Sequence, residues 1–92
     1  MSEIDVILIE LHRLLTEVKD SGWTDELHSQ VQRLFARANP LIKEIDDWDE
    51  MERVYKNASK VAGMASYLFI EKDLEVREFF GLLGIGTNEK KN

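Results

Sequence analysis

The sequence contains no cysteine and only one proline in 92 residues. Without cysteine the chain forms neither a disulfide nor a thiolate metal site, so its core must be held by packing alone. The absence of cysteine also fits a reducing compartment. No run of about 18 apolar residues occurs, and the first residues lack the basic start and apolar stretch of a secretory signal. These absences predict a cytoplasmic protein without a membrane segment.

Charge and composition restrict the class of protein further. Charged residues make up 33% of the chain and hydrophobic residues 43%, which is typical of a globular protein. The length favours a single domain, expected over residues 1–86, with a polar tail at 87–92. A net charge of −6 opposes binding to nucleic-acid phosphates and favours either solubility or a partner with a basic surface.

Apolar residues recur at helical spacing along most of the chain, which predicts an all-α fold. The first helix is expected over 3–20, with Ser2 as its N-cap and Asp5 three positions on. Thr24 is a good N-cap for a second helix. That helix should end near Asn39, because the residue before a proline is pushed out of the α region.

A single long helix is predicted over 40–72, and Asp46-Asp47 is where a kink would fall. Its apolar pattern starts with Leu41, Ile45 and Trp48 and continues through Met51, Tyr55, Ala58, Ala62, Ala65 and Phe69. Asp73 can cap a last short helix, which Gly81, Gly84 and Gly86 weaken and then end. Four helices with short connections predict a small antiparallel helical bundle.

One segment is strongly acidic. Six carboxylates lie between residues 44 and 52, namely Glu44, Asp46, Asp47, Asp49, Glu50 and Glu52. One interpretation is an ordinary solvated surface in which Asp46 or Asp47 caps a helix. The other is a docking face for a basic partner protein, formed by Glu44, Asp47, Asp49 and Glu50. In that case Trp48 and Met51 would be its apolar anchors.

More apolar side chains are present than one helical stripe accommodates. On the backs of the first and the long helix lie Val6, Ile9, Met64, Tyr67 and Leu68. Single apolar residues on a surface are common, and a central helix of a bundle could bury Met64 and Tyr67, but several such residues together favour a second contact surface. We therefore expect self-association, with a homodimer as the simplest assembly.

The evidence for catalysis in the sequence is slight. Glu44 and Asp47 are three residues apart, as are Glu75 and Glu78. This pattern resembles that of all-α nucleotide pyrophosphatases, which bind magnesium with two such pairs, although the order of the pairs is reversed here. No nucleophile motif or phosphate-binding loop occurs. We expect no catalytic residue, bound metal or cofactor.

The sequence therefore predicts a small acidic helical protein that binds and modulates another protein, as an adaptor, an inhibitor or an immunity-like protein. A second hypothesis is an acidic inhibitor that mimics nucleic acid or occupies a basic site of its target. The third, from a different class, is a small metal-dependent all-α hydrolase that uses the paired carboxylates. Neither nucleic acid nor a membrane is expected as a partner.

Overall fold

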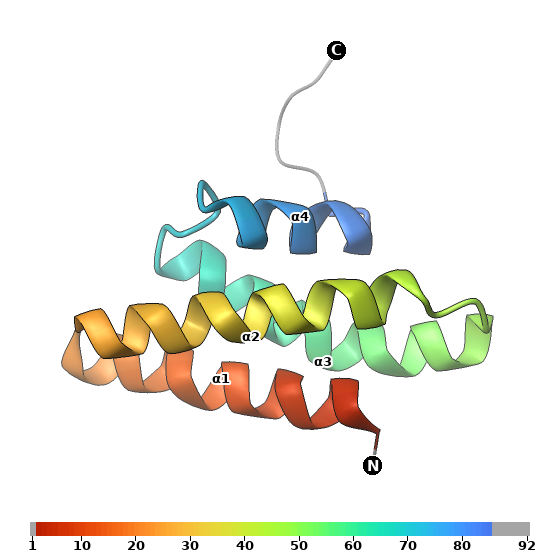
Figure 1. The fold of residues 1–92 in the computed structure, drawn as a ribbon, viewed down its shortest axis with the longest axis horizontal. Coiled ribbons are helices and arrows are strands. Elements are labelled where there is room, and N and C mark those ends of the chain that lie inside the picture. Colours follow the sequence, from red (N-terminus) through yellow and green to blue (C-terminus); the bar gives the residue numbers. More distant parts are fainter. Residues whose placement is uncertain (1, 86–92) are drawn as a thin grey trace.

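The computed structural model describes residues 2–85, which form four helices and no strand. The helices are α1 (Glu3–Ser21), α2 (Asp25–Lys43), α3 (Trp48–Tyr67) and α4 (Leu74–Leu83). Figure 1 shows that consecutive helices run in opposite directions, so the predicted all-α bundle is confirmed. None of these helices is long and apolar enough to cross a membrane. The predicted tail at 87–92 lies outside the described residues.

The packing order differs from the chain order. α1 packs against both α2 and α3, α2 packs against α4, and α3 makes a smaller contact with α4. Helices α2 and α3 are joined directly but pack mainly against other helices. The pairs α1/α3 and α2/α4 therefore lie side by side and run in the same direction (Figure 1).

The helix starts follow from local hydrogen bonding. The backbone N–H and the hydroxyl of Ser2 both donate to the Asp5 carboxylate, at 3.3 and 2.8 Å. The hydroxyl of Thr24 accepts the backbone N–H of Leu27 at 3.1 Å. Ser2 and Thr24 are thus confirmed as the residues that begin α1 and α2. Asp47 and Asp73 occupy the N-cap positions of α3 and α4, but neither side chain makes a capping hydrogen bond.

The core is continuous across all four helices. Phe35 of α2 and Phe79 of α4 pack edge to face, with ring centroids 5.0 Å apart. Asn39 is buried beside them, and its side-chain amide donates to the backbone carbonyl of Glu75 at 3.0 Å. This bond attaches α2 to the first turn of α4.

The single helix predicted over 40–72 is wrong. Pro40 lies inside α2, which continues to Lys43, and residues 44–47 separate α2 from α3. Proline costs α2 one backbone hydrogen bond. The helix nevertheless continues, because Ala38 and Ile42 extend its buried face past the proline. The helical pattern is interrupted at the position predicted for a kink, where Asp47 is extended and precedes the first turn of α3.

The C-terminal end of the predicted long helix is also wrong, because α3 ends before residue 72. α3 ends at Tyr67, and the N–H groups of Phe69 and Ile70 bond back to the carbonyls of Ser66 and Ala65. These two hydrogen bonds form a Schellman motif, in which the residue that ends the helix adopts a left-handed conformation. Phe69 is that residue, with φ 62°, so its side chain leaves the core side that the stripe predicted.

Candidate functional site

The acidic segment covers one end of the bundle. Residues 44–52 run from the end of α2 through the connection and into the first turns of α3. Five of the six carboxylates are exposed, and Glu50 is partly buried. Among residues 2–85, Glu50 is the one member of the run with an ion pair, to Arg53 at 3.9 Å. The other five leave their charge facing solvent.

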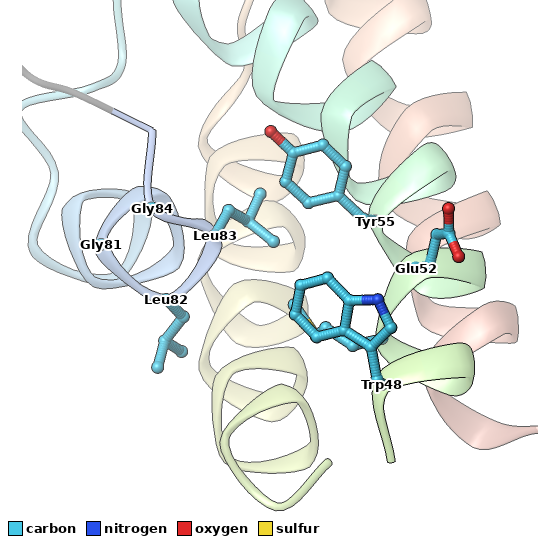
Figure 2. Close-up of a pocket in the computed structure, with 8 residues that line it drawn as sticks. Trp48, Glu52, Tyr55, Gly81, Leu82, Leu83 and Gly84 are labelled. Atoms are coloured by element: carbon cyan, nitrogen blue, oxygen red, sulfur yellow. The ribbon is translucent and has the colours of Figure 1, made fainter. Parts of the chain in front are cut away.

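An apolar groove lies beside this segment, between the start of α3 and the end of α4. It encloses about 470 Å³ and is lined by Trp48, Met51, Glu52 and Tyr55 of α3 and by 81–84 of α4. Figure 2 shows the two aromatic rings projecting from α3 toward α4, with Leu83 projecting toward them. The acidic residues and Trp48, which the sequence predicted to bind a partner, therefore lie beside the same groove.

The groove exists because three residues of α3 share a face that the core does not use. Trp48, Glu52 and Tyr55 are spaced by four and three residues, and such residues lie along one side of a helix. Val54 and Ala58 occupy the neighbouring side and are fully buried. Trp48 is consequently 77% exposed and Tyr55 40% exposed.

The part of the groove formed by α4 includes two glycines, Gly81 and Gly84, whose lack of side chains leaves space above the helix. Gly81 is helical, and a Cβ added there would meet no atom within 4 Å. Gly84 ends α4 in the left-handed conformation at φ 71°. The segment was predicted to be a helix end, which is confirmed. Its part in a groove had no signal in the sequence, because it depends on where α4 packs.

The stripe predicted for the long helix is partly wrong. Ala58, Ala62 and Ala65 are buried as expected, whereas the three aromatic residues of the pattern, Trp48, Tyr55 and Phe69, are exposed. The helix turns Val54 and Val61 inward instead, so the buried face is rotated from the predicted stripe. Tyr55 is thereby available to the groove.

The five residues predicted for self-association are not brought together. Met64 and Leu68 are partly buried against the core, whereas Val6, Ile9 and Tyr67 are exposed. Ile9 shares a small hollow with Asn57. Tyr67 lies ten residues further along α3, roughly 15 Å away at the helical rise. These side chains do not form one continuous patch.

The far end of the bundle carries its own exposed apolar residues. Trp23, Tyr67, Phe69 and Leu74 lie in or next to the α1–α2 and α3–α4 connections. The Lys19 ammonium lies 6.0 Å from the centroid of the Tyr67 ring.

A salt link fastens α1 to α3 close to the acidic segment. Arg53 donates to both carboxylate oxygens of Asp5, at 2.7 and 2.8 Å, and Asp5 is 5% exposed. Burial by itself raises the pKa of Asp5, but the hydrogen bonds from Ser2 and Arg53 outweigh it and leave the pKa below its ordinary value. Asp5 is thus a buried ionised group that positions α3.

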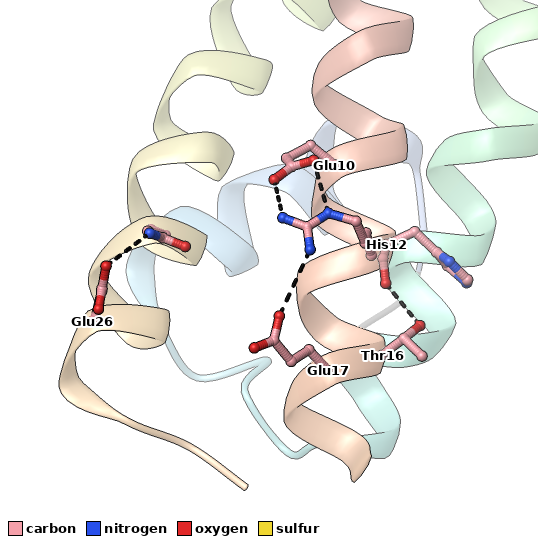
Figure 3. Close-up of polar contacts among 7 residues, drawn as sticks. Glu10, His12, Thr16, Glu17 and Glu26 are labelled. Carbon is pink, nitrogen blue, oxygen red and sulfur yellow. Dashed lines mark hydrogen bonds and ion pairs between the residues drawn. The ribbon is translucent and has the colours of Figure 1, made fainter. Parts of the chain in front are cut away.

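The histidines and carboxylate pairs do not converge on a metal site. Within residues 2–85, no group of three histidine, aspartate or glutamate side chains is placed to hold a metal ion. His12 and His28 are exposed, and His28 lies 3.7 Å from Asp73. Thr16 donates its hydroxyl to the His12 carbonyl (Figure 3), a bond within the helix.

The remaining polar contacts on α1 are ordinary surface pairs. Arg13 donates to Glu10, and its guanidinium lies 3.7 Å from the Glu17 carboxylate. Figure 3 marks the contacts of Glu10 and Glu17 with dashed lines. The hydrogen bond from Arg13 is the main reason that the pKa of Glu10 is lowered. Pairs at this spacing on an exposed helix stabilise it only slightly. They indicate no site.

Comparison with known proteins adds no relative. No family model, no curated protein and no solved structure matches the chain.

Proposed function

We propose that this chain is an interaction protein that binds a segment of another protein in the groove between α3 and α4. The observation that carries the proposal is Trp48, which is 77% exposed on the edge of an apolar groove. Tryptophan and tyrosine are the residues most often responsible for binding energy at protein interfaces. Both Trp48 and Tyr55 line this groove.

The acidic segment supports the same function. An apolar groove bordered by exposed charge has the anatomy of an interface, with an apolar centre and a polar rim. Charges on a rim steer encounter and select partners more than they add affinity. Five acidic side chains without an ion pair among residues 2–85 suit that role, and they favour a basic partner.

The proposal is tested by capturing partners from the source cells and measuring them again with purified components. Trp48→Ser removes the exposed ring from the groove, and Tyr67→Ser removes one from the far end of the bundle. Calorimetry should show that the first change weakens a captured partner at least tenfold, the loss of one aromatic anchor. The second should leave binding unchanged. Equal affinities for wild type and Trp48→Ser would refute the proposal.

A second candidate is an acidic inhibitor that occupies a basic site of its target, which the unpaired carboxylates favour. In this candidate the carboxylates, and not Trp48, would provide most of the binding affinity. For such an inhibitor, replacing Asp47, Asp49 and Glu52 by their amides should abolish binding, whereas Trp48→Ser should change it little. The same calorimetric series therefore separates the two functions.

A further inference from the structure

We infer that the groove receives one face of a basic amphipathic helix supplied by the partner protein. This inference rests on the proposed function and adds the chemistry and the conformation of the occupant. It draws on three properties of the groove: the backbone of its walls, the charge of its lining and the space above Gly81.

The walls favour a helical occupant. Both are helices, α3 and α4, whose backbone N–H and carbonyl groups bond mainly within each helix. An extended segment seated there would find no free row of backbone partners, as it would at the edge of a sheet. A helix satisfies its own backbone, so it can enter an apolar groove without leaving its peptide groups unpaired.

The dimensions fit a short stretch of helix. Trp48 and Tyr55 are seven residues apart on α3, about 10 Å along its axis. The same span separates the first and last of three apolar anchors at positions i, i+4 and i+7 of a bound helix. The groove's volume of about 470 Å³ lies in the range of sites that bury a few large side chains.

The charge of the rim selects the polar flank of that helix. No lysine or arginine lines the groove, and Glu52 is part of the lining. Asp47 and Asp49 are exposed on either side of Trp48, and neither has an ion pair within residues 2–85. Lysine or arginine beside the apolar anchors would complement these carboxylates, while acidic residues there would be repelled.

Gly81 keeps the groove open. A helical glycine lowers stability by roughly 0.5–1 kcal/mol relative to alanine, and no neighbour of Gly81 requires the absence of a side chain. A side chain at this position would extend into the space that the proposed helix occupies. Filling that space is a sharper perturbation than removing Trp48, because it adds to the protein without taking away a contact.

Gly63 provides the matched control. It is also helical, on α3, and a Cβ there likewise meets nothing within 4 Å. It does not line the groove. Gly81→Leu and Gly63→Leu should therefore both fold and both melt at or above the wild-type temperature, while only the first fills the groove.

The experiment is a selection from displayed peptides of about 20 residues, long enough for several helical turns. Wild type is the bait, and Gly81→Leu is the counter-selection. The enriched peptides should carry apolar residues at helical spacing, flanked by lysine or arginine. Synthetic peptides should gain helical circular dichroism on binding. Gly81→Leu should weaken them at least tenfold, and Gly63→Leu should not.

Two further readouts test the chemistry of the occupant. In a Trp23→Phe background Trp48 is the one remaining tryptophan, and its emission should shift to the blue when the peptide covers it. Replacing Asp47, Asp49 and Glu52 by their amides should weaken a selected peptide roughly tenfold at low salt, and less as salt screens the pairs.

The possible failures are distinguishable. Enriched peptides that Gly81→Leu excludes but that are neither basic nor helical would overturn this inference and leave the proposed function standing. If no peptide that binds the wild type survives the counter-selection with Gly81→Leu, the groove is not the binding site, and both the inference and the proposed function fall.

Discussion

Replacing Phe69 by glycine should stabilise the protein, although it removes an aromatic side chain. Phe69 turns the chain at the end of α3 with φ 62°, and Gly84 does the same at the end of α4 with φ 71°. The hydrogen bonds match as well: Ile70 and Ile85 each donate to the carbonyl five residues back. One motif thus carries glycine, which suits the conformation, and the other carries phenylalanine.

The magnitude follows from three contributions. The left-handed conformation costs a residue with a side chain about 1–2 kcal/mol. Glycine returns that cost but makes the unfolded chain more flexible, which removes about 0.4–1 kcal/mol. The ring of Phe69 is 84% exposed, so its loss forfeits little buried area. The net gain for Phe69→Gly should be about 0.5–1 kcal/mol, or roughly 2–8 °C in melting temperature.

Urea denaturation and thermal melts would measure this gain, with Phe69→Ala as the control. Alanine also removes the ring but keeps the unfavourable conformation, so its stability should stay within about 0.5 kcal/mol of wild type. A Phe69→Gly protein no more stable than Phe69→Ala would show that the turn stores no strain. A loss in both variants would show that the ring packs more than its exposure indicates.

Four other substitutions have expected outcomes. The pKa of Asp5 is lowered in the folded protein, so its carboxylate should stabilise the fold fully above the unfolded pKa of 3.8, and this stability should be lost as the pH falls through the folded pKa. In urea melts at acidic pH, Asp5→Asn should therefore lose less stability with falling pH than the wild type. Asn39→Asp should cost at least about 2 kcal/mol near neutral pH, because it buries an unpaired charge and removes the amide donor; a melting temperature equal to wild type would contradict this. Glu44→Gln should raise stability by about 0.3 kcal/mol, because Glu44 lies at the negative end of α2, and Asp49→Asn should lower it by a similar amount, because Asp49 lies in the first turn of α3. Changes of the same sign would refute the dipole argument.

The starts of α1 and α2 could be predicted from the sequence because local chemistry determines them. Ser2 with Asp5, and Thr24 alone, provide side-chain groups at the first turns, and each begins a helix as expected. The range predicted for the first helix differs from α1 by one residue. Such signals act over three or four residues, which is the distance a sequence pattern resolves.

The helix ends depended on tertiary packing and were predicted less well. Pro40 was expected to begin a helix, but the burial of Ile42 and the bond from Asn39 to α4 favour continuing α2 through it. Tyr55 and Phe69 fit the helical stripe as well as the alanines do. Which of two overlapping stripes is buried depends on the position of α1 and α4, and the pattern of α3 alone does not contain that information.

The candidate site was half visible in the sequence. The acidic run and Trp48 were identified from composition, because charge and aromatic content need no tertiary structure. Tyr55 was assigned to the core, and the part of Gly81 and Leu82 in the α4 wall was not foreseen. These residues become part of a groove only when α4 packs across the start of α3. That contact joins segments that lie 26 to 36 residues apart in the sequence.

Helix capping does not account for the whole acidic segment. Asp47, Asp49 and Glu50 lie at the N-terminus of α3, where its dipole favours negative charge. Glu44 lies at the opposite pole of α2, where negative charge is unfavourable, and Glu52 lies beyond the first turn of α3. Stability therefore explains the middle of the run and leaves its two ends unexplained. Glu52 lines the groove itself, so a rim that attracts basic side chains is the role that relates this charge to the exposed aromatic residues beside it.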